Sequence, residues 1–237
     1  MLPPSGQSEL AFYITVPSAC NYLPDRKAVT VFADPFAGMS KTLYSTLVEH
    51  GFRRSGEHVY VPYCPNCDAC VPARIPVERF YMSRSQRRNW QCNADITVHR
   101  VAASFQNEHY KLYQRYVTQR HPGGGMEHYG PEQYLSFFGC RWGETWLYEF
   151  RCGTDLLAVA SVDHLVSGLS AIYTFFDPAQ TERGLGTYAV LWQVNEAKRL
   201  NLPFVYLGYW IAESKKMNYK ANFHPLEIYR NNRWSDL

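Results

Sequence analysis

The stretch "ERGLGTYAVLWQVNEAKRL" (residues 182–200) decides the fold, because it joins a glycine-rich turn directly to a long helical pattern. Three strand-like runs precede it, "TWLYEFR", "LLAVASVDHL" and "LSAIYTFFDP", with turn-forming residues at 153–155 and 167–168 between them. A further strand-like run, "PFVYLGYW", follows the helix. Antiparallel strands followed by a turn, a helix and another strand predict a mixed sheet covered by helices.

This order of elements resembles the acetyltransferase-like (GNAT) fold. In that fold, backbone N–H groups of a glycine-rich loop at a helix N-terminus hold the pyrophosphate of coenzyme A. The match is approximate, because the pattern has Gln or Arg three residues before its first glycine. If Gly184 and Gly186 are the glycines, Thr181 occupies that position here. A helix-start turn that uses glycine for tight packing is the alternative, and another phosphate-bearing acyl donor stays open.

The length of 237 residues fits one large domain or two small ones, and 46% hydrophobic with 19% charged residues is typical of a globular chain. We predict the α+β class. Residues 101–237 would form the acetyltransferase-like transfer domain, with its mixed sheet and helices. Residues 1–100 would form a smaller N-terminal α+β region with a cysteine cluster and a basic segment. Helical patterns fall at 40–52, 83–93, 107–121 and 131–139.

The charge distribution and the search for targeting signals limit which kinds of partner the sequence predicts. We find no basic start leading into an apolar run and no apolar stretch of about 18 residues, so we expect a cytoplasmic protein with no membrane partner. The net charge of +3 indicates a nucleic-acid partner only weakly. The distribution says more, because residues 51–90 carry seven arginines against three acids. Arginine suits carboxylate and phosphate better than lysine does, because its planar guanidinium can hydrogen-bond two oxygens at once.

Three cysteines follow one another at intervals of three in "CPNCDAC". Seven cysteines in a chain expected in the cytoplasm argue against a disulfide framework. The spacing instead allows one zinc ion or an iron–sulfur cluster to take three thiolates, with a fourth from upstream. The alternative is a turn whose thiols stay reduced. The candidate ligands are Cys20, Cys64, Cys67 and Cys70.

Several segments together resemble the arginyl/leucyl-tRNA–protein transferase family, over about residues 10–230. They are "CNYLPDRKA", "GFRRSGEHVYVPYCPNCDACVPARIPVERFYMSRSQRR", "YQRYVTQRHPGGGM", "SAIYTFFDP", "GLGTYAVL" and "YLGYWIAESKKMNYKANFHPLE". The compact length is most similar to the bacterial, leucine-transferring branch.

This resemblance implies that an amino acid passes from an aminoacyl-tRNA to the N-terminal Asp or Glu of a protein, which marks that protein for degradation. The partners would be charged tRNA, with leucyl-tRNA favoured over arginyl-tRNA, and acceptors with those N-termini. The ester is already activated, so the chemistry requires no metal, cofactor or ATP. Groups of cysteines in this region bind a metal ion or an iron–sulfur cluster in the wider family, which favours a metal site at the four candidate cysteines.

The chemistry needs groups that bind the acceptor, bind the tRNA and handle the proton of the amine. For the acidic N-terminus, the candidates are Arg74, Arg84, Arg87 and Arg88, with phosphate contacts or a solvated basic face as alternatives. For the tRNA end, they are Lys215, Lys216, Tyr219 and Lys220, with an ordinary surface loop as the alternative. For catalysis, they are Asp163, Tyr173 and Tyr209, with a turn former and core packing as alternatives.

Two rival functions stay open. One is a coenzyme A-dependent N-acetyltransferase, against which the imperfect glycine motif counts. The other is a non-enzymatic, zinc-containing RNA-binding protein, which would explain the cysteines and arginines but not the acetyltransferase-like half.

Overall fold

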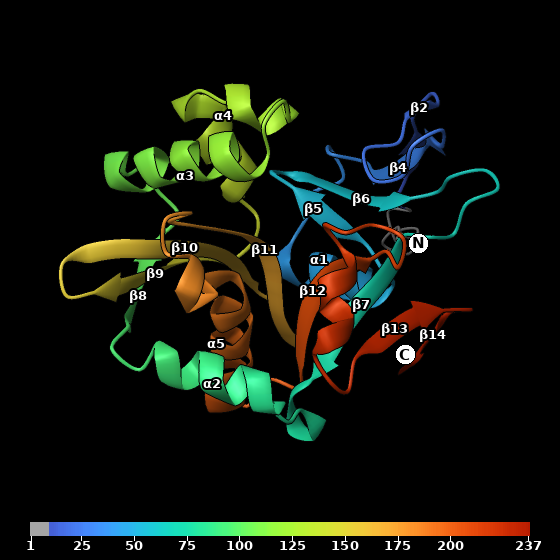
Figure 1. Cartoon of the computed structure of the whole chain (residues 1–237). Helices are drawn as coiled ribbons and strands as arrows, with labels where there is room; N and C mark the ends of the chain where they lie inside the picture. Colours follow the sequence, from blue (N-terminus) through green and yellow to red (C-terminus); the bar gives the residue numbers. More distant parts are fainter. Residues whose placement is uncertain (1–9) are drawn as a thin grey trace, which may run out of the picture.

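The computed structural model describes residues 10–237, and its centre is an eight-stranded sheet (Figure 1). The strand order is β14-β13-β7-β12-β11-β10-β9-β8, and of these neighbours only β11 and β12 run parallel. The strands are β7 (Val71–Pro76), β8 (Thr97–Ala102), β9 (Thr145–Cys152), β10 (Asp155–His164), β11 (Gly168–Phe176), β12 (Phe204–Trp210), β13 (Glu227–Arg230) and β14 (Arg233–Asp236). The mixed α+β class predicted from the sequence is confirmed.

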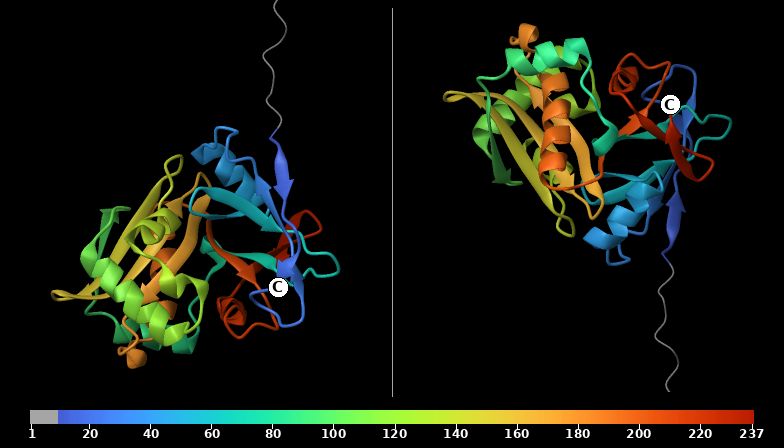
Figure 2. Two further views of the ribbon diagram at one scale, coloured as in Figure 1. Left: turned by 90° about the horizontal axis from the view of Figure 1, so that it is seen from above. Right: turned by 90° about the horizontal axis from the view of Figure 1, so that it is seen from below.

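The N-terminal region adds a second, antiparallel sheet in the order β1-β4-β6-β5. Its strands are β1 (Phe12–Ile14), β4 (Thr30–Ala33), β6 (His58–Pro62) and β5 (Arg53–Ser55), and a short hairpin joins β2 (Ser18–Ala19) to β3 (Lys27–Ala28). Figure 2 shows these blue and cyan strands on the same side of the molecule as the red C-terminal segment. The reason is β7, which leaves this region to pair with β12 on one side and β13 on the other.

The division predicted near residue 100 therefore falls inside a strand, β8, of the larger sheet. Both β7 and β8 come from the first 102 residues, and they pair with strands from the rest of the chain. Two folding units within the chain stay a prediction.

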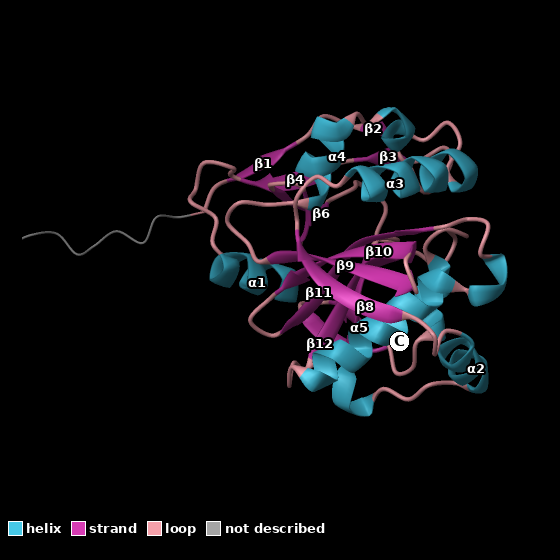
Figure 3. Cartoon of the chain, turned by 90° about the vertical axis from the view of Figure 1, so that its left-hand side faces the viewer, coloured by secondary structure: helices cyan, strands magenta, loops and turns pink. Residues whose placement is uncertain are grey.

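Helices cover both faces of the large sheet (Figure 3). α5 (Leu185–Arg199) and α2 (Arg84–Cys92) lie on one face, and α3 (Asn107–Arg120) and α4 (Pro131–Phe138) lie on the other. Each face has its own cluster of buried apolar side chains. Local sequence sets the helix starts: Ser83 and Gln86 form a capping box at α2, and Ser40 caps α1 (Lys41–Glu49). No helix within residues 10–237 is both long and apolar enough to cross a bilayer.

Strands β11 and β12 part after a short parallel pairing, which ends at Ser170 and Tyr206. A register shift follows at once in each strand, with Ile172 bulging from β11 and Leu207 from β12. Bulges bend a strand away from its neighbour. The sheet therefore has a defined point at which two parallel strands diverge.

Candidate active site

Arg53, on β5, fills the point where the two strands diverge. Its guanidinium donates to the Ser170 Oγ, at 2.7 Å, and to the backbone oxygen of Ala171, both on β11. On the other side it lies against Gly208 of β12, where an added Cβ would come within 3.0 Å of the Arg53 Nε. Gly208 has φ of +76°, a conformation that glycine adopts most easily. The glycine therefore makes room for the guanidinium.

Lys220 brings a second cation to the same place from the 3-10 helix η4 (Asn218–Asn222). Only 4% of Lys220 is exposed, and its Nζ donates to the backbone oxygen of Tyr209. Met217 Sδ lies 3.7 Å from the same nitrogen. Burial, together with the charge of Arg53, lowers the pKa of Lys220 to about 7. Lys220 and Arg53 thus reach the same strand at adjacent residues, Tyr209 and Gly208.

Neither cation has a carboxylate partner among residues 10–237, where the other ion pairs of buried side chains are readily found, such as Arg54 with Asp163. Arg53 is 9% exposed, so solvent screens its charge little. Burying a charge without a counter-charge costs several kcal/mol. A site built in this way favours a negatively charged group on a ligand.

Tyrosines surround the two cations. Burial raises the pKa of Tyr22 to about 12, with Tyr60 adding to the rise and the Arg53 charge opposing it. The rings of Tyr60 and Tyr209 lie 6.3 Å apart. Tyr219 is 44% exposed, so its ring leads from Lys220 to the solvent. The site thus combines buried positive charge with aromatic walls.

The glycine turn before α5 is covered by α2. Asn89 Nδ2 donates to the backbone oxygens of Arg183, at 2.8 Å, and Gly184, at 3.2 Å. A Cβ added at Gly184 would lie 2.6 Å from that nitrogen, and one at Gly186 would lie 3.2 Å from the Phe176 ring. These contacts fit the tight-packing alternative.

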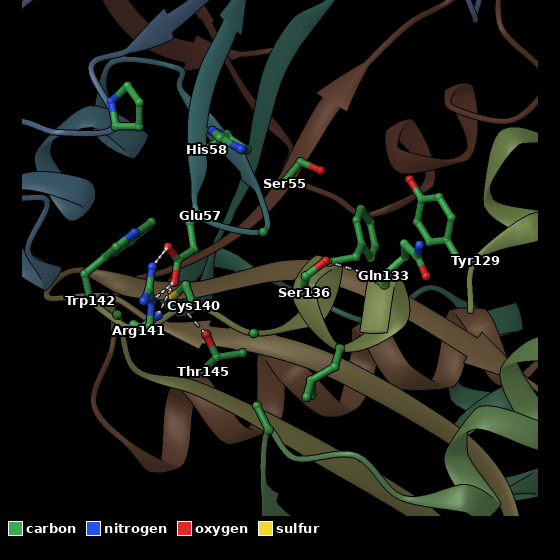
Figure 4. Close-up of a pocket in the computed structure, with 17 residues that line it drawn as sticks. Ser55, Glu57, His58, Tyr129, Gln133, Ser136, Cys140, Arg141, Trp142 and Thr145 are labelled. Atoms are coloured by element: carbon green, nitrogen blue, oxygen red, sulfur yellow. Dashed lines mark hydrogen bonds and ion pairs between the residues drawn. The ribbon is translucent and has the colours of Figure 1, made fainter. Parts of the chain in front are cut away.

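A separate hollow of about 910 Å³ opens between the β5–β6 turn, α4 and the loop that follows α4 (Figure 4). Glu57 and Arg141 lie next to one another on one side of it and pair at 2.6 Å and 2.8 Å. Its two oppositely charged side chains therefore satisfy each other. None of the site residues predicted from the sequence lines this hollow.

Comparison with known proteins adds what geometry alone does not give. Family models described as "Arginine-tRNA-protein transferase, N terminus" and "Arginine-tRNA-protein transferase, C terminus" match residues 18–88 and 108–230. The chain belongs to the arginine-tRNA-protein transferase family. The predicted family is therefore confirmed, and so is the predicted enzyme class, an aminoacyl-tRNA–protein transferase.

Two relatives named "Aspartate/glutamate leucyltransferase" match almost the full chain. One, from Nitrosococcus oceani, is 55% identical over 95% of both chains. The other, from Pseudomonas entomophila, is 50% identical over 97% of this chain and 98% of its own. Solved structures are more distant: FemX has a TM-score of 0.49 at 7% identity, covering 87% of this chain and 81% of its own. L-PGS from Bacillus licheniformis has a TM-score of 0.48 at 12% identity, covering 60% and 47%.

The cysteines predicted as metal ligands gather beside the two cations of this family member. Burial raises the pKa of the Cys70 thiol to about 12, and the thiols of Cys64, Cys20 and Cys67 add to the rise, while Lys220 opposes it. All four thiols are free, and that of Cys64 hydrogen-bonds to the backbone of Val29. In the described part of the chain, no three His, Cys, Asp or Glu side chains are arranged to hold a metal ion. The ligand set stays a prediction.

Asp163, predicted as a catalytic carboxylate, is held in a buried ion pair. Its two oxygens accept from Nε and Nη2 of Arg54, both at 2.6 Å, and the Thr145 hydroxyl donates to one of them at 2.7 Å. Only 2% of its side chain is exposed. The geometry gives Asp163 a structural role, and a role as base stays a prediction.

The two predicted catalytic tyrosines are also packed. The Tyr209 hydroxyl donates to the backbone oxygen of Gly51 at 3.0 Å, and burial raises its pKa well above the ordinary value. Tyr173 lies edge-on to Phe137 and Phe138, and burial likewise raises its pKa. Both hydroxyls therefore stay protonated at neutral pH. Of the two, Tyr209 lies closer to the cations, because its backbone oxygen accepts from Lys220.

The predicted acceptor-binding arginines do not form one cluster. Arg74, on β7, pairs with Glu227 at 2.7 Å and stacks 3.5 Å above the Phe204 ring. Arg84, Arg87 and Arg88 are instead exposed on α2. Gln86 of the same helix donates to the backbone oxygen of Asn222, at 3.0 Å, which ties α2 to η4.

The predicted tRNA-binding residues divide in the same way. Lys215, Lys216 and Tyr219 are exposed, whereas Lys220 is buried. Burial and the charges of Lys216 and Arg120 lower the pKa of His121, which places Lys216 near the end of α3. The exposed members form a basic, aromatic surface next to the buried cations.

Sequence reasoning missed Arg53 as a site residue. A signal was present, because "RRS" forms a short strand between Gly51 and Gly56, and successive strand residues point to opposite faces. Two adjacent arginines in a strand this short cannot both lie on one surface.

Proposed function

We propose that the protein transfers leucine from leucyl-tRNA to the N-terminal amine of proteins that begin with Asp or Glu, and so marks them for degradation. The observation that carries the proposal is the 55% identity, over 95% of both chains, to a protein named for this activity. The reaction uses charged tRNA and takes place in the cytoplasm.

The reaction replaces an ester bond with an amide bond. The α-amine of the acceptor attacks the carbonyl carbon of the leucyl ester, the bond to the ribose oxygen breaks, and the proton lost by the amine ends on the ribose hydroxyl. The enzyme must place the amine, stabilise the developing oxyanion and recognise the acidic side chain. Buried positive charge next to an open aromatic surface suits the recognition of an acidic group.

We assign the transfer to the point where β11 and β12 diverge. The order β9, β10, β11, α5, β12, with one parallel pair, supports an acetyltransferase-like architecture for this half of the chain. α2 packs against the glycine turn, which favours the tight-packing alternative for its glycines. The donor would therefore bind through its tRNA.

The exposed basic residues suit the tRNA backbone. Phosphate contacts dominate the affinity of nucleic-acid complexes, and they need cations that solvent can reach. The structure supports this role for the residues of α2 and of the segment around η4, which Gln86 ties together. They are Arg84, Arg87, Arg88, Lys215, Lys216 and Tyr219.

A transfer assay tests the proposal. Purified protein is mixed with tRNA charged with labelled leucine or, separately, labelled arginine, and with peptides that begin with Asp, Glu or Ala. We expect label from leucyl-tRNA to enter the Asp and Glu peptides and not the Ala peptide. Label entering only from arginyl-tRNA would replace leucine by arginine as the donor. No transfer from either tRNA would overturn the proposed function.

A further inference from the structure

We infer that Arg53 and Lys220 together bind the side-chain carboxylate of the acceptor's N-terminal Asp or Glu, and so set the acceptor specificity. This inference rests on the proposed function. It moves acidic recognition away from the arginines of α2 and places it at the divergence of β11 and β12.

Charge balance is the first argument. Two cations lie within one buried region, because Arg53 lies against Gly208 and Lys220 donates to the backbone oxygen of the next residue, Tyr209. Neither meets a carboxylate within the described residues. A carboxylate delivered by a ligand would neutralise both at once, and its own burial would be offset by two charge-assisted contacts.

Unused hydrogen-bond donors are the second argument. A guanidinium has five N–H groups, and Arg53 uses donors on Nη1 and Nη2 for Ser170 and Ala171. Its Nε–H donates no hydrogen bond to another described residue. Lys220 has three donors, and the Tyr209 oxygen and Met217 sulfur are its contacts. Donors are therefore left on both side chains for the two oxygens of one carboxylate.

The burial of Arg53 and Lys220 favours the acceptor carboxylate over a tRNA phosphate as their ligand. A tRNA phosphate lies on a bulky backbone, and residues that are 9% and 4% exposed are poorly placed to meet it. The exposed Lys215 and Lys216 are better placed. A carboxylate on one or two methylenes is a much smaller group than a phosphate within a nucleic-acid backbone. The acceptor side chain therefore fits this site best.

Specificity follows from the same charges. An acceptor that begins with Ala would leave both cations desolvated and unpaired, and one that begins with Asn would keep the shape without the charge. Sites built to pair a buried polar group reject analogues that lack it by large factors. We expect the wild-type protein to prefer an Asp peptide over the matched Asn peptide by a factor on the order of 100 or more.

The test measures kcat/KM for Asp and Asn peptides, and KM for leucyl-tRNA, in Lys220→Met and in Arg53→Lys. The first removes a charge and keeps the apolar stem, and the second keeps a charge but loses the fork. Both substitutions should lower kcat/KM for the Asp peptide by at least tenfold. They should leave kcat/KM for the Asn peptide and the KM for leucyl-tRNA unchanged. Arg199→Met, which removes an exposed cation paired with Glu196, is the matched control.

Three results would overturn the inference. An equal fall in kcat for both peptides would assign the cations to the oxyanion. A raised KM for leucyl-tRNA would assign them to the donor. A loss of the Asp preference in the triple variant Arg84→Met, Arg87→Met, Arg88→Met, but not in Lys220→Met, would return recognition to α2.

Direct binding separates this inference from the proposed function. Fluorescence anisotropy of labelled Asp and Asn peptides, without tRNA, reports the acceptor site alone. If the wild-type protein transfers no amino acid yet binds the Asp peptide more tightly than the Asn peptide, and Lys220→Met abolishes that difference, the function fails and the inference stands. Equal binding of the two peptides by the wild-type protein would overturn the inference whatever the transfer assay shows.

Discussion

Arg53 and Arg54 are adjacent residues of β5, yet Arg54 is paired with a carboxylate and Arg53 has none among the residues that the structure describes. Arg54 donates two hydrogen bonds of 2.6 Å to Asp163, and its Nη2 also donates to the backbone oxygen of Phe138 at 3.0 Å. Within residues 10–237, Arg53 hydrogen-bonds to a hydroxyl and a backbone oxygen on β11 and to no carboxylate. The strand alternation thus separates a structural cation from one that is free to bind.

Asp163→Asn should destabilise the protein strongly. The substitution leaves Arg54 buried without a counter-charge, and breaking such a pair costs roughly 3–5 kcal/mol. Chemical denaturation measures this loss, and the protein that stays folded should keep its preference for Asp over Asn peptides. Glu57→Gln, which breaks an ion pair with an arginine that is 88% exposed, should change stability far less. An Asp163→Asn protein with wild-type stability and no transfer would instead make Asp163 the base.

Gly208→Ala should displace Arg53. The new Cβ would lie 3.0 Å from its Nε and 3.2 Å from its Cζ, and the backbone holds φ of +76°. Gly153→Ala provides a matched comparison, because Gly153 has φ of +57° and no atom within 4 Å of the added Cβ. Both variants should lose about 1 kcal/mol of stability from the left-handed backbone. Only Gly208→Ala should also lower kcat/KM for the Asp peptide, and equal kinetics in the two would contradict the placement of Arg53.

Lys220→Met should stabilise the protein while it damages function. A buried lysine whose pKa falls from 10.5 to about 7 favours the neutral form in the folded state, so the unfolded state binds more protons between those values. The folded wild type therefore loses stability as pH falls toward 7. We expect Lys220→Met to gain roughly 2 kcal/mol at pH 7.

The pH dependence of that gain is the sharper measurement. The advantage of Lys220→Met should shrink as pH rises from about 7 to 9, by at most about 1.4 kcal/mol per pH unit. The charged and titratable groups facing Lys220 are Arg53, Cys70 and Tyr219. Urea unfolding at three pH values checks the slope. A Lys220→Met protein less stable than the wild type throughout would show that the amine holds the fold together.

Acetyl-coenzyme A should not bind. Asn89 and Asn93 both donate to the backbone oxygen of Arg183 at 2.8 Å, and α2 covers the glycine turn. Calorimetric titration should give no saturable heat. Asn89→Ala should cost about 1–2 kcal/mol, because it removes the contacts to Arg183 and Gly184. Saturable binding of acetyl-coenzyme A by the wild type would revive the acetyltransferase alternative.

Much of the fold is legible in the sequence, because its signals are local. The pattern at 107–121 predicts a helix that the structure shows as α3, Asn107–Arg120, and a cap and an early proline fix α2 and α4. The position of β7 is not local. Its pairing with β12 and β13 depends on residues more than a hundred positions away.

The site is harder to predict from the sequence, because it depends on which cationic side chains are buried. Lys220 stands in "ESKKMNYK" beside Lys215 and Lys216, and nothing in the letters separates a lysine that is buried from two that are exposed. Arg53 is hidden in the same way among the arginines of residues 51–90. Their roles emerge only when β5, β11, β12 and η4 are brought together.

The placement of β7 has a consequence for synthesis of the chain on the ribosome. β7 is complete at Pro76, but its two neighbours, β12 and β13, begin at Phe204 and Glu227. The apolar face of β7, with Val71, Ala73 and Ile75, therefore emerges long before the strands that cover its edges. The central sheet can close only after Arg230 has been synthesised, and a nascent chain halted before residue 204 exposes both edges of β7 to chaperones and proteases.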